Sequence, residues 1–251
     1  MNAPLVITRP EEAGVKGFDK VFAFLRDQLL SGAIRPGDLL IPERELATQL
    51  KVSRPSLREA LRALAVIGVV EIRHGVGTIV RRPDASVLGE FFTFALAHKS
   101  DVIEDVMEAR IAIECQAIRL ACQRAAASDL ERVRAELANI AATIGDPEKG
   151  GRADYEFHLQ LVRAAKSETL LGMYQAISEL LLRSHLDRRA LVRASAGMRE
   201  YLIEDHRRIY DALAERDPQK ADAVLRKHFA IGDEYRRKAA RDDIGIEETK
   251  G

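Results

Sequence analysis

Helical periodicity dominates this chain and sets the strongest limit on its fold. From residue 86 to residue 241, apolar residues recur at helical spacing, and no segment alternates as a strand does. The pattern predicts about seven helices, which span residues 86–99, 101–127, 128–143, 154–165, 169–192, 199–215 and 218–241. The glycine-rich residues 145–151 are expected to form a loop. Helices with one apolar face bury it against each other, so this part predicts an all-α antiparallel helical bundle.

The first 82 residues follow a different pattern, in which three helices precede a β-hairpin. Helices are predicted over residues 18–31, 43–50 and 54–67, and strands are predicted over residues 69–73 and 78–82. Pro36-Gly37 predicts a tight turn after the first helix, because proline fixes φ and glycine allows a positive φ. The order of helix, helix, helix and hairpin is that of a winged helix-turn-helix, so the chain is expected to be mainly α.

These patterns divide the chain into five segments. We expect a flexible N-terminal arm (1–17), a winged helix-turn-helix domain (18–82), a linker (83–87), an all-α domain (88–241) and a charged tail (242–251). The 39 basic and 39 acidic residues cancel, which removes the simplest argument for nucleic-acid binding, a strongly basic chain. The charges are unevenly placed, however, because residues 1–82 carry a net charge of +4 and the remainder carries −4.

The composition argues against several other classes of protein. Hydrophobic residues make up 47% of the chain, which is enough for a core and too much for a disordered protein. Two cysteines cannot build a disulfide scaffold or a zinc cluster of cysteines. The first residues lack the pattern of a signal peptide, and no apolar run reaches the roughly 18–20 residues that cross a bilayer. We therefore expect a cytoplasmic protein that has no membrane partner.

A row of arginines marks the third helix. Arg54, Arg58 and Arg62 are spaced by four residues and lie opposite the apolar stripe of the helix. Like charges at this spacing repel each other, and the phosphates and guanine edges of DNA would remove that cost. The alternative is a solvated arginine face on a small helical domain. The turn before this helix and the hairpin after it favour a helix-turn-helix that reads DNA.

Short motifs in the first part occur in a fixed order, as ERELA, then VSRPSLREAL, then the glycine-containing GVGT of the hairpin. Over residues 18–82, this order resembles the winged-helix domain of GntR-family transcription regulators. The family has Pro-Ser where this chain has Ile41-Pro42, so the serine cap of the second helix is missing. The resemblance implies DNA contacts from the turn, the second and third helices and the wing, namely Arg35, Arg44, Arg54, Ser56, Arg58, His74 and Gly75.

Four residues of the helical part are candidate metal ligands. Asp154 and His158 are four residues apart, so both project from one face of one predicted helix. His206 and His228 lie on two later helices. One carboxylate and three imidazoles suit a divalent transition metal, with zinc as the first choice and nickel or manganese as alternatives. Spacing alone is weak evidence, because an Asp-x-x-x-His pair is more often a surface pair and each later histidine is by default an ordinary helix residue.

The order of these residues adds to the argument. An E-x-R-x-x-x-E segment over residues 108–114 comes first, the Asp154 and His158 pair follows, then H-x-x-I-x-x-A-L from His206, and finally His228. Over residues 88–240, this order is similar to the FCD effector domain of the FadR subfamily of GntR regulators. The resemblance implies that the four candidate ligands bind a metal and that a small carboxylate completes the site.

Two further residues are interpreted with this resemblance in view. Arg110 lies in the E-x-R-x-x-x-E segment and is expected to clamp the carboxylate of an effector, since a guanidinium can donate two parallel hydrogen bonds. The alternative is a structural salt bridge with Glu108 or Glu114. His185 matches no metal position and is expected at the surface or at the rim of the pocket.

The leading hypothesis is a regulator, not an enzyme. A homodimer would place two recognition helices on a palindromic operator, and a small acid bound at the metal would switch it, most often as a repressor in this family. One alternative is a metal sensor, in which the metal itself is the signal. Another is a metal-dependent hydrolase, which is weakened because no carboxylate beside the ligands is clearly placed as a base.

Overall fold

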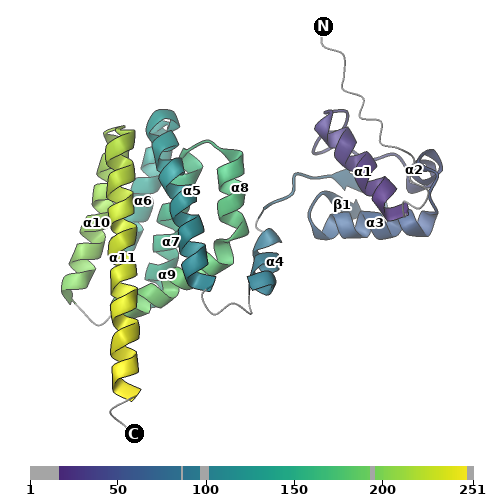
Figure 1. Cartoon of the computed structure of the whole chain (residues 1–251). Helices are drawn as coiled ribbons and strands as arrows, with labels where there is room; N and C mark the ends of the chain where they lie inside the picture. Colours follow the sequence, from purple (N-terminus) through teal and green to yellow (C-terminus); the bar gives the residue numbers. More distant parts are fainter. Residues whose placement is uncertain (1–16, 86, 97–101, 193–195, 248–251) are drawn as a thin grey trace. The chain divides into compact units, whose positions relative to one another are not determined.

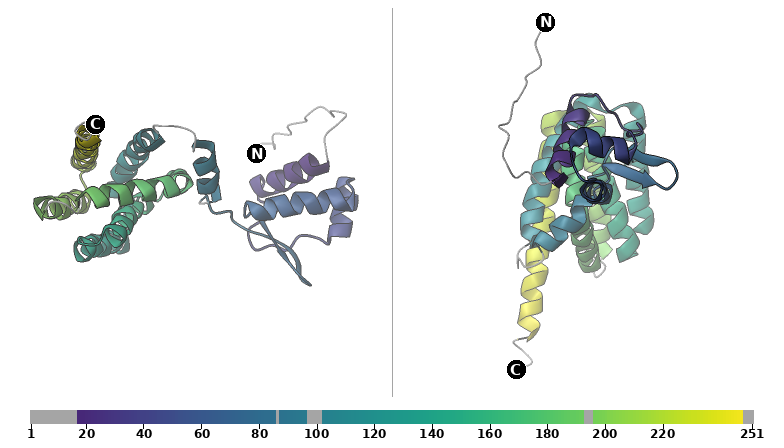
Figure 2. Two further views of the ribbon diagram at one scale, coloured as in Figure 1. Left: turned by 90° about the horizontal axis from the view of Figure 1, so that it is seen from below. Right: turned by 90° about the vertical axis from the view of Figure 1, so that its right-hand side faces the viewer.

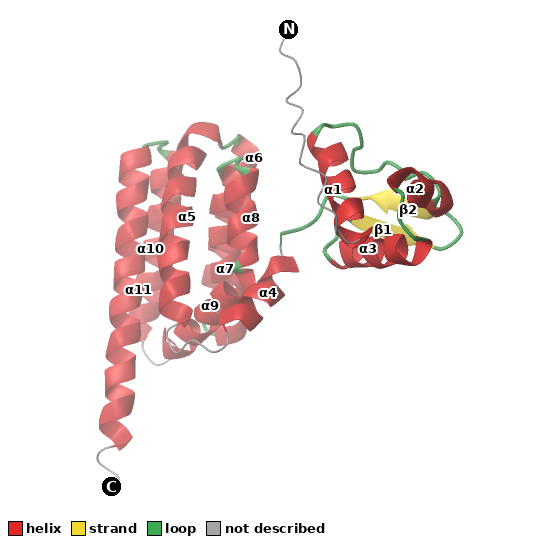
Figure 3. Ribbon diagram, turned by 45° about the vertical axis from the view of Figure 1, so that its right-hand side comes forward, coloured by secondary structure: helices red, strands yellow, loops and turns green. Residues whose placement is uncertain are grey.

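The chain divides into two units between Asp84 and Ala85, and each is described by itself. The computed structural model describes residues 17–85, 87–96, 102–192 and 196–247. The fold is mainly α, as the periodicity predicted (Figure 1). The only strands among the described residues belong to the first unit, where Figure 3 shows them in yellow.

The first unit is a winged helix-turn-helix. Its elements are α1 (Gly17–Leu30), α2 (Glu43–Leu50), α3 (Arg54–Val66), β1 (Val70–Arg73) and β2 (Gly77–Val80). The two strands pair antiparallel, with Val70 opposite Val80 and Arg73 opposite Gly77. One apolar core joins the three helices to β1, and its most deeply buried members are Val21, Leu25, Leu46, Leu57, Ala60 and Leu61.

The beginning of α3 follows from its first residues. The Oγ atom of Ser53 accepts a hydrogen bond from the backbone N–H of Ser56 at 3.2 Å, which satisfies a donor that has no partner within the helix. Pro55 lies in the first turn, where its missing N–H costs nothing. By contrast, α2 begins after Pro42 without a side-chain cap, as the absent serine predicted.

The second unit contains eight helices within the described residues, one more than the periodicity suggested. They are α4 (Val87–Leu96), α5 (Val102–Arg124), α6 (Ala127–Thr143), α7 (Pro147–Ala164), α8 (Glu168–Ala176), α9 (Ser178–Val192), α10 (Ala196–Ala214) and α11 (Pro218–Glu247). The difference arises at Ile177, where the helix predicted over 169–192 breaks into α8 and α9. Figure 2 shows several of these helices nearly end-on, gathered around a shared interior.

The predicted loop over residues 145–151 was wrong, because most of it is the first turn of α7. Asp146 caps this helix by accepting hydrogen bonds from the N–H groups of Glu148 and Lys149, both at 3.1 Å. Pro147 follows as the first helical residue, a position that suits proline. The glycine run therefore belongs to the helix, and the signals of the cap and of proline outweigh the glycine composition.

The glycines of α7 allow a close approach to α9. A Cβ atom added at Gly151 would lie 3.0 Å from the Cα atom and 2.8 Å from the Cδ2 atom of Leu186. Only glycine fits such a contact without a shift of one helix. The two helices are thus held together at the level of the buried histidines described below. No helix among the described residues is long and apolar enough to span a membrane.

Candidate metal centre and nucleic-acid interface

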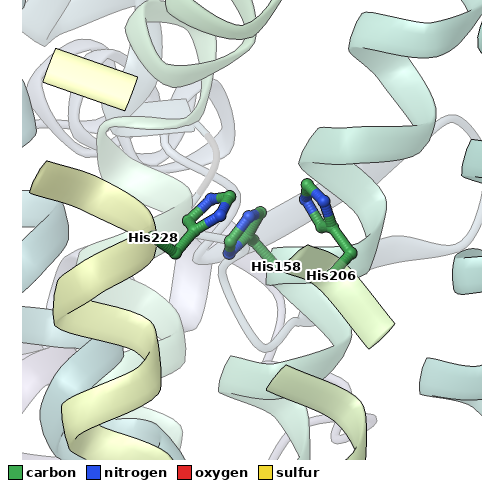
Figure 4. Close-up of side chains that lie close together, drawn as sticks. All are labelled: His158, His206 and His228. Atoms are coloured by element: carbon green, nitrogen blue, oxygen red, sulfur yellow. The ribbon is translucent and has the colours of Figure 1, made fainter. Parts of the chain in front are cut away.

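Three histidines from three helices meet in the interior of the second unit. His158 lies on α7, His206 on α10 and His228 on α11, and all three are buried. One ring nitrogen from each histidine lies within 4.8 Å of the others, so a small inward shift of the rings would bring all three to one metal ion. Figure 4 shows the three rings turned toward one another. The helices are far apart in the sequence, so this cluster is a product of the tertiary fold.

Asp154 adds a carboxylate to the three imidazoles. Its Oδ1 atom lies 3.4 Å from Nε2 of His158 and 3.3 Å from Nε2 of His206, and the side chain is fully buried. Asp154 and His158 share one face of α7, as their spacing predicted. Three neutral imidazoles and one carboxylate form a donor set that suits a divalent transition metal.

The outer nitrogen of each histidine has a partner that fixes the orientation of its ring. Nδ1 of His158 lies 2.6 Å from Glu114 Oε2, and Nδ1 of His228 lies 2.7 Å from Asp205 Oδ2. Nδ1 of His206 lies 2.8 Å from the carbonyl oxygen of Leu202. Such partners leave each Nε2 atom to face the centre, an arrangement common around protein metal ions. Nε2 of His158 is buried and has no hydrogen-bond partner among the residues that the structure describes, which fits a nitrogen that binds a cation.

The protonation states of the site also suit a cation. Burial lowers the pKa of His206, so this imidazole stays neutral at physiological pH even though Asp154 opposes the shift. Burial alone would raise the pKa of Glu114, but Arg110 and His158 hold it well below its usual range. Burial would likewise raise the pKa of Asp205, and the hydrogen bond with His228 lowers it. A neutral His206 and the ionised carboxylates of Glu114 and Asp205 are therefore part of this site.

Arg110 is fully buried and forms the salt bridge that the sequence offered as the alternative to an effector clamp. Its Nε atom donates to Glu114 Oε1 at 2.6 Å, and Glu108 is not the partner in this ion pair. The hydroxyl of Tyr174 donates to the same carboxylate oxygen at 3.0 Å. The guanidinium carbon lies 4.8 Å from the ring centre of Phe229. One terminal nitrogen, Nη2, is buried without a hydrogen-bond partner in the described part of the chain.

Two residues of α9 belong to this site and were missed by sequence reasoning. His185, expected at the surface or the rim, is fully buried with Nδ1 3.0 Å from Asp154 Oδ1. Arg189, one turn later, donates from Nε to Asp154 Oδ2 at 3.1 Å. Their spacing of four residues places both on one face of the helix, and that spacing was the available signal. The signal was weak because α9 is rich in arginine.

The residues expected to contact DNA lie on the surface of the first unit. Ser56 is half-buried. The other six residues are exposed, namely Arg35, Arg44, Arg54, Arg58, His74 and Gly75. Gly75 has a φ of +74°, a value that suits glycine at the tip of the hairpin. Arg58 does not extend freely from α3, because its Nε atom lies 2.8 Å from Glu43 Oε2 at the start of α2. The side-chain hydroxyls of Ser53 and Ser56 share a hydrogen bond, with their Oγ atoms 2.8 Å apart.

Comparison with known families agrees with both units. The model described as "Bacterial regulatory proteins, gntR family" matches residues 18–80, and the FCD domain model matches residues 105–230. The HTH-type transcriptional regulator LutR of Bacillus subtilis is 32% identical over 200 residues, which are 79% of this chain and 91% of LutR. The chain belongs to the GntR family of bacterial regulators.

Other relatives of this GntR-family regulator agree with that assignment. A protein of Escherichia coli named for regulation of the L-lactate dehydrogenase operon is 30% identical over 90% of this chain and 87% of its own. A solved structure of a Streptococcus agalactiae GntR protein has a TM-score of 0.63 and 24% identity, and the match covers 86% of this chain and 99% of that one. The relatives are named as transcription regulators and the structure shares the fold, so the chain is a transcription regulator and not an enzyme.

Proposed function

We propose that this regulator binds a palindromic operator as a homodimer and is switched by a small carboxylate at a metal site in its helical unit. In this proposal, the DNA-binding domain comprises residues 18–82 and the effector domain comprises residues 88–241. Residues 83–87 link the two domains, residues 1–17 form an N-terminal arm and residues 242–251 form a charged tail. The regulator acts in the cytoplasm, most simply as a repressor. The observation that carries the proposal is the buried cluster of three histidines and Asp154 in a chain from a family of DNA-binding regulators.

The proposed metal ligands are Asp154, His158, His206 and His228. Their nitrogen and oxygen atoms face a shared point, and the outer atoms of the three rings are already engaged. Imidazole and carboxylate ligands favour zinc, and nickel or manganese would also be accepted. A metal bound here would supply a Lewis-acidic centre for an oxygen of the effector. Arg110 would offer its unpartnered Nη2 atom to the same effector.

The proposed DNA contacts are the exposed residues of the first unit named above. Arg54 and Arg58 project from α3, whose N-terminal part would enter the major groove. Guanidiniums at these positions can donate two hydrogen bonds to guanine. Arg35, Arg44, Ser56 and the wing residues His74 and Gly75 would position the domain on phosphates or base edges.

The proposed effector is a small acid that chelates the metal. One relative is named for the L-lactate dehydrogenase operon, and L-lactate is a small acid with one carboxylate. Binding of the acid would change the operator affinity only to the extent that it favours one arrangement of the dimer.

The experiment that tests this function is capture of genomic fragments by the purified protein, followed by sequencing. We expect enrichment of a short palindrome beside a few metabolic genes. Arg54→Ala should then weaken operator binding by about 1–3 kcal/mol and relax specificity at one base position, as a base-reading arginine does. Arg134→Ala is the matched control, since Arg134 is an exposed arginine of α6 in the other unit.

Two outcomes would contradict parts of the proposal. No enrichment over random DNA at low salt would contradict operator binding. A second outcome is that the protein releases the operator when zinc is removed by a chelator, or when zinc alone is added, and does not respond to any acid. This result would identify a metal sensor instead of a regulator switched by an effector.

A further inference from the structure

We propose that Arg189 of α9 is the carboxylate-binding group of the effector pocket, and that it selects small acids with a single carboxylate. This inference rests on the proposed function, because it names the residue and the chemical class for the same site. Arg110 then serves mainly to hold Glu114, and it contributes one donor where Arg189 contributes two.

The hydrogen bonds of Arg189 leave its terminal fork unused. The side chain is only 2% exposed, and Nε donates to Asp154 Oδ2 at 3.1 Å. Both terminal nitrogens, Nη1 and Nη2, are buried and have no hydrogen-bond partner among the described residues. A buried guanidinium with two unsatisfied donors is costly, and native proteins rarely keep one without a purpose. A carboxylate accepts two parallel hydrogen bonds from such a fork.

The hydrogen bond to Asp154 brings the guanidinium of Arg189 close to the proposed metal ligands. Asp154 connects the two groups, since its Oδ1 atom faces the histidine nitrogens and its Oδ2 atom faces Arg189. Gly150 of α7 lies against the arginine side chain, where an added Cβ would come 3.9 Å from the Arg189 Cδ atom. A ligand that touches both the metal and the fork would therefore need a second oxygen near its carboxylate.

Arg110 is less suited to the same task. Its Nε atom donates to Glu114 at 2.6 Å, and within the described residues Nη2 is its one buried nitrogen that lacks a hydrogen-bond partner. Its guanidinium also lies over the ring of Phe229, which occupies one face of the group. One free donor can orient a ligand oxygen, but a bidentate grip needs two.

The buried charges around the site indicate how many carboxylates the ligand carries. Two buried guanidiniums, Arg110 and Arg189, and three buried carboxylates, Glu114, Asp154 and Asp205, lie around the histidines. Counted at the formal charges of these five groups, the site carries one net negative charge, and a divalent metal converts it to one net positive charge. A buried site is most stable when its charges cancel, so one ionised carboxylate balances it and two exceed it.

The test is calorimetric titration of the zinc-loaded full-length protein with acetate, glycolate, L-lactate and succinate. The amide of the tightest-binding monocarboxylic acid is titrated as well, because it keeps the shape of the acid and loses its charge. Wild-type protein should prefer a monocarboxylate to succinate, and the acid to its amide. Arg189→Gln should lose at least about tenfold in affinity for the acid and lose the preference over the amide. Zinc content, measured by mass spectrometry, should be unchanged.

Two further variants keep the interpretation clear. Arg183→Gln removes an exposed arginine from the same helix and should bind like wild type. Arg189→Lys keeps the positive charge and a donor for Asp154 but has no fork, so it should retain zinc and still bind the acid more weakly than wild type.

The outcomes separate the inference from the proposed function. Equal affinity for the acid in wild type and Arg189→Gln would overturn the role of Arg189 and leave the proposed carboxylate effector intact. Preference for succinate would overturn the single-carboxylate class. No binding of any of the four acids by zinc-loaded wild type would overturn both the inference and the proposed effector, whereas operator capture tests DNA binding separately.

Discussion

At the scale of single residues, the candidate metal centre depends on side chains that each serve two partners. Asp154 divides its oxygens between the histidine nitrogens and Arg189, and Glu114 divides its oxygens between His158 and Arg110. The carboxylate of Asp205 orients a single histidine, since its Oδ2 atom lies 2.7 Å from Nδ1 of His228. A carboxylate that orients a metal-binding histidine is often as important as the ligand itself.

Asp205→Asn should therefore weaken zinc binding by about 10–100-fold, because the ring of His228 loses the charge that orients it and raises its basicity. Asp211→Asn, which changes an exposed aspartate of the same helix, should leave zinc affinity unchanged. Competition with a chromogenic chelator at pH 7 measures both variants. Equal affinity in Asp205→Asn and wild type would remove Asp205 from the site.

The pH dependence of this effect has a definite sign. The pKa of Asp205 lies below its usual 3.8, so its contribution is present above that value and is lost only as the pH falls through the lowered pKa. Asp205 should therefore remain ionised from about pH 8 to about pH 5, so zinc affinity should stay lower in Asp205→Asn than in wild type across this range. Zinc affinity itself should fall over the acidic part of this range in both proteins, since protons compete for the imidazoles.

At the scale of elements, the contact between α7 and α9 brings Arg189 and His185 to Asp154. Gly151 faces the backbone of Leu186 with no room for a side chain. Interiors are packed so closely that an inserted methyl group must push one helix away. The separation of the two helices therefore controls how Asp154 is held.

Gly151→Ala should destabilise the second unit by about 1–3 kcal/mol and lower its zinc affinity, because the new methyl group forces α7 and α9 apart. Gly145→Ala is the matched control, since nothing lies within 4 Å of a Cβ built at Gly145. Thermal unfolding and zinc titration measure the two effects. Unchanged zinc affinity in a destabilised Gly151→Ala would show that the close contact supports stability only.

At the scale of the whole molecule, the two units carry different spectroscopic labels. The chain has no tryptophan, and all five tyrosines follow residue 150. Tyrosine signals therefore report on the helical unit alone, whereas far-ultraviolet circular dichroism reports on both units. This difference allows the metal to be assigned to one unit within the intact chain.

Zinc at about 100 times its dissociation constant should raise the tyrosine-detected unfolding midpoint by about 5–10 °C, because it binds only the folded helical unit. Asp154→Asn should lose most of this shift. A zinc-induced shift of equal size in Asp154→Asn would contradict the proposed ligand set.

Local chemistry was sufficient to predict the elements of the first unit. Its turns, cap and hairpin are set by residues close in sequence, such as Ser53 before α3 and Gly75 at the hairpin tip. Periodicity likewise predicted a helical second unit and one shared face for Asp154 and His158. It failed where short-range signals compete, at the glycines of α7 and at the break after α8.

The sequence by itself thus determined the helices, the wing and the arginine row of α3, because these depend on neighbours within a few residues. Only the tertiary structure decided that His158, His206 and His228 meet, that His185 is buried and that the fork of Arg189 lies beside Asp154. The physical reason is that helical periodicity indicates which face of a helix is apolar, but it does not indicate which other helix packs against that face. That choice depends on close packing between distant segments, as at Gly151 and Leu186.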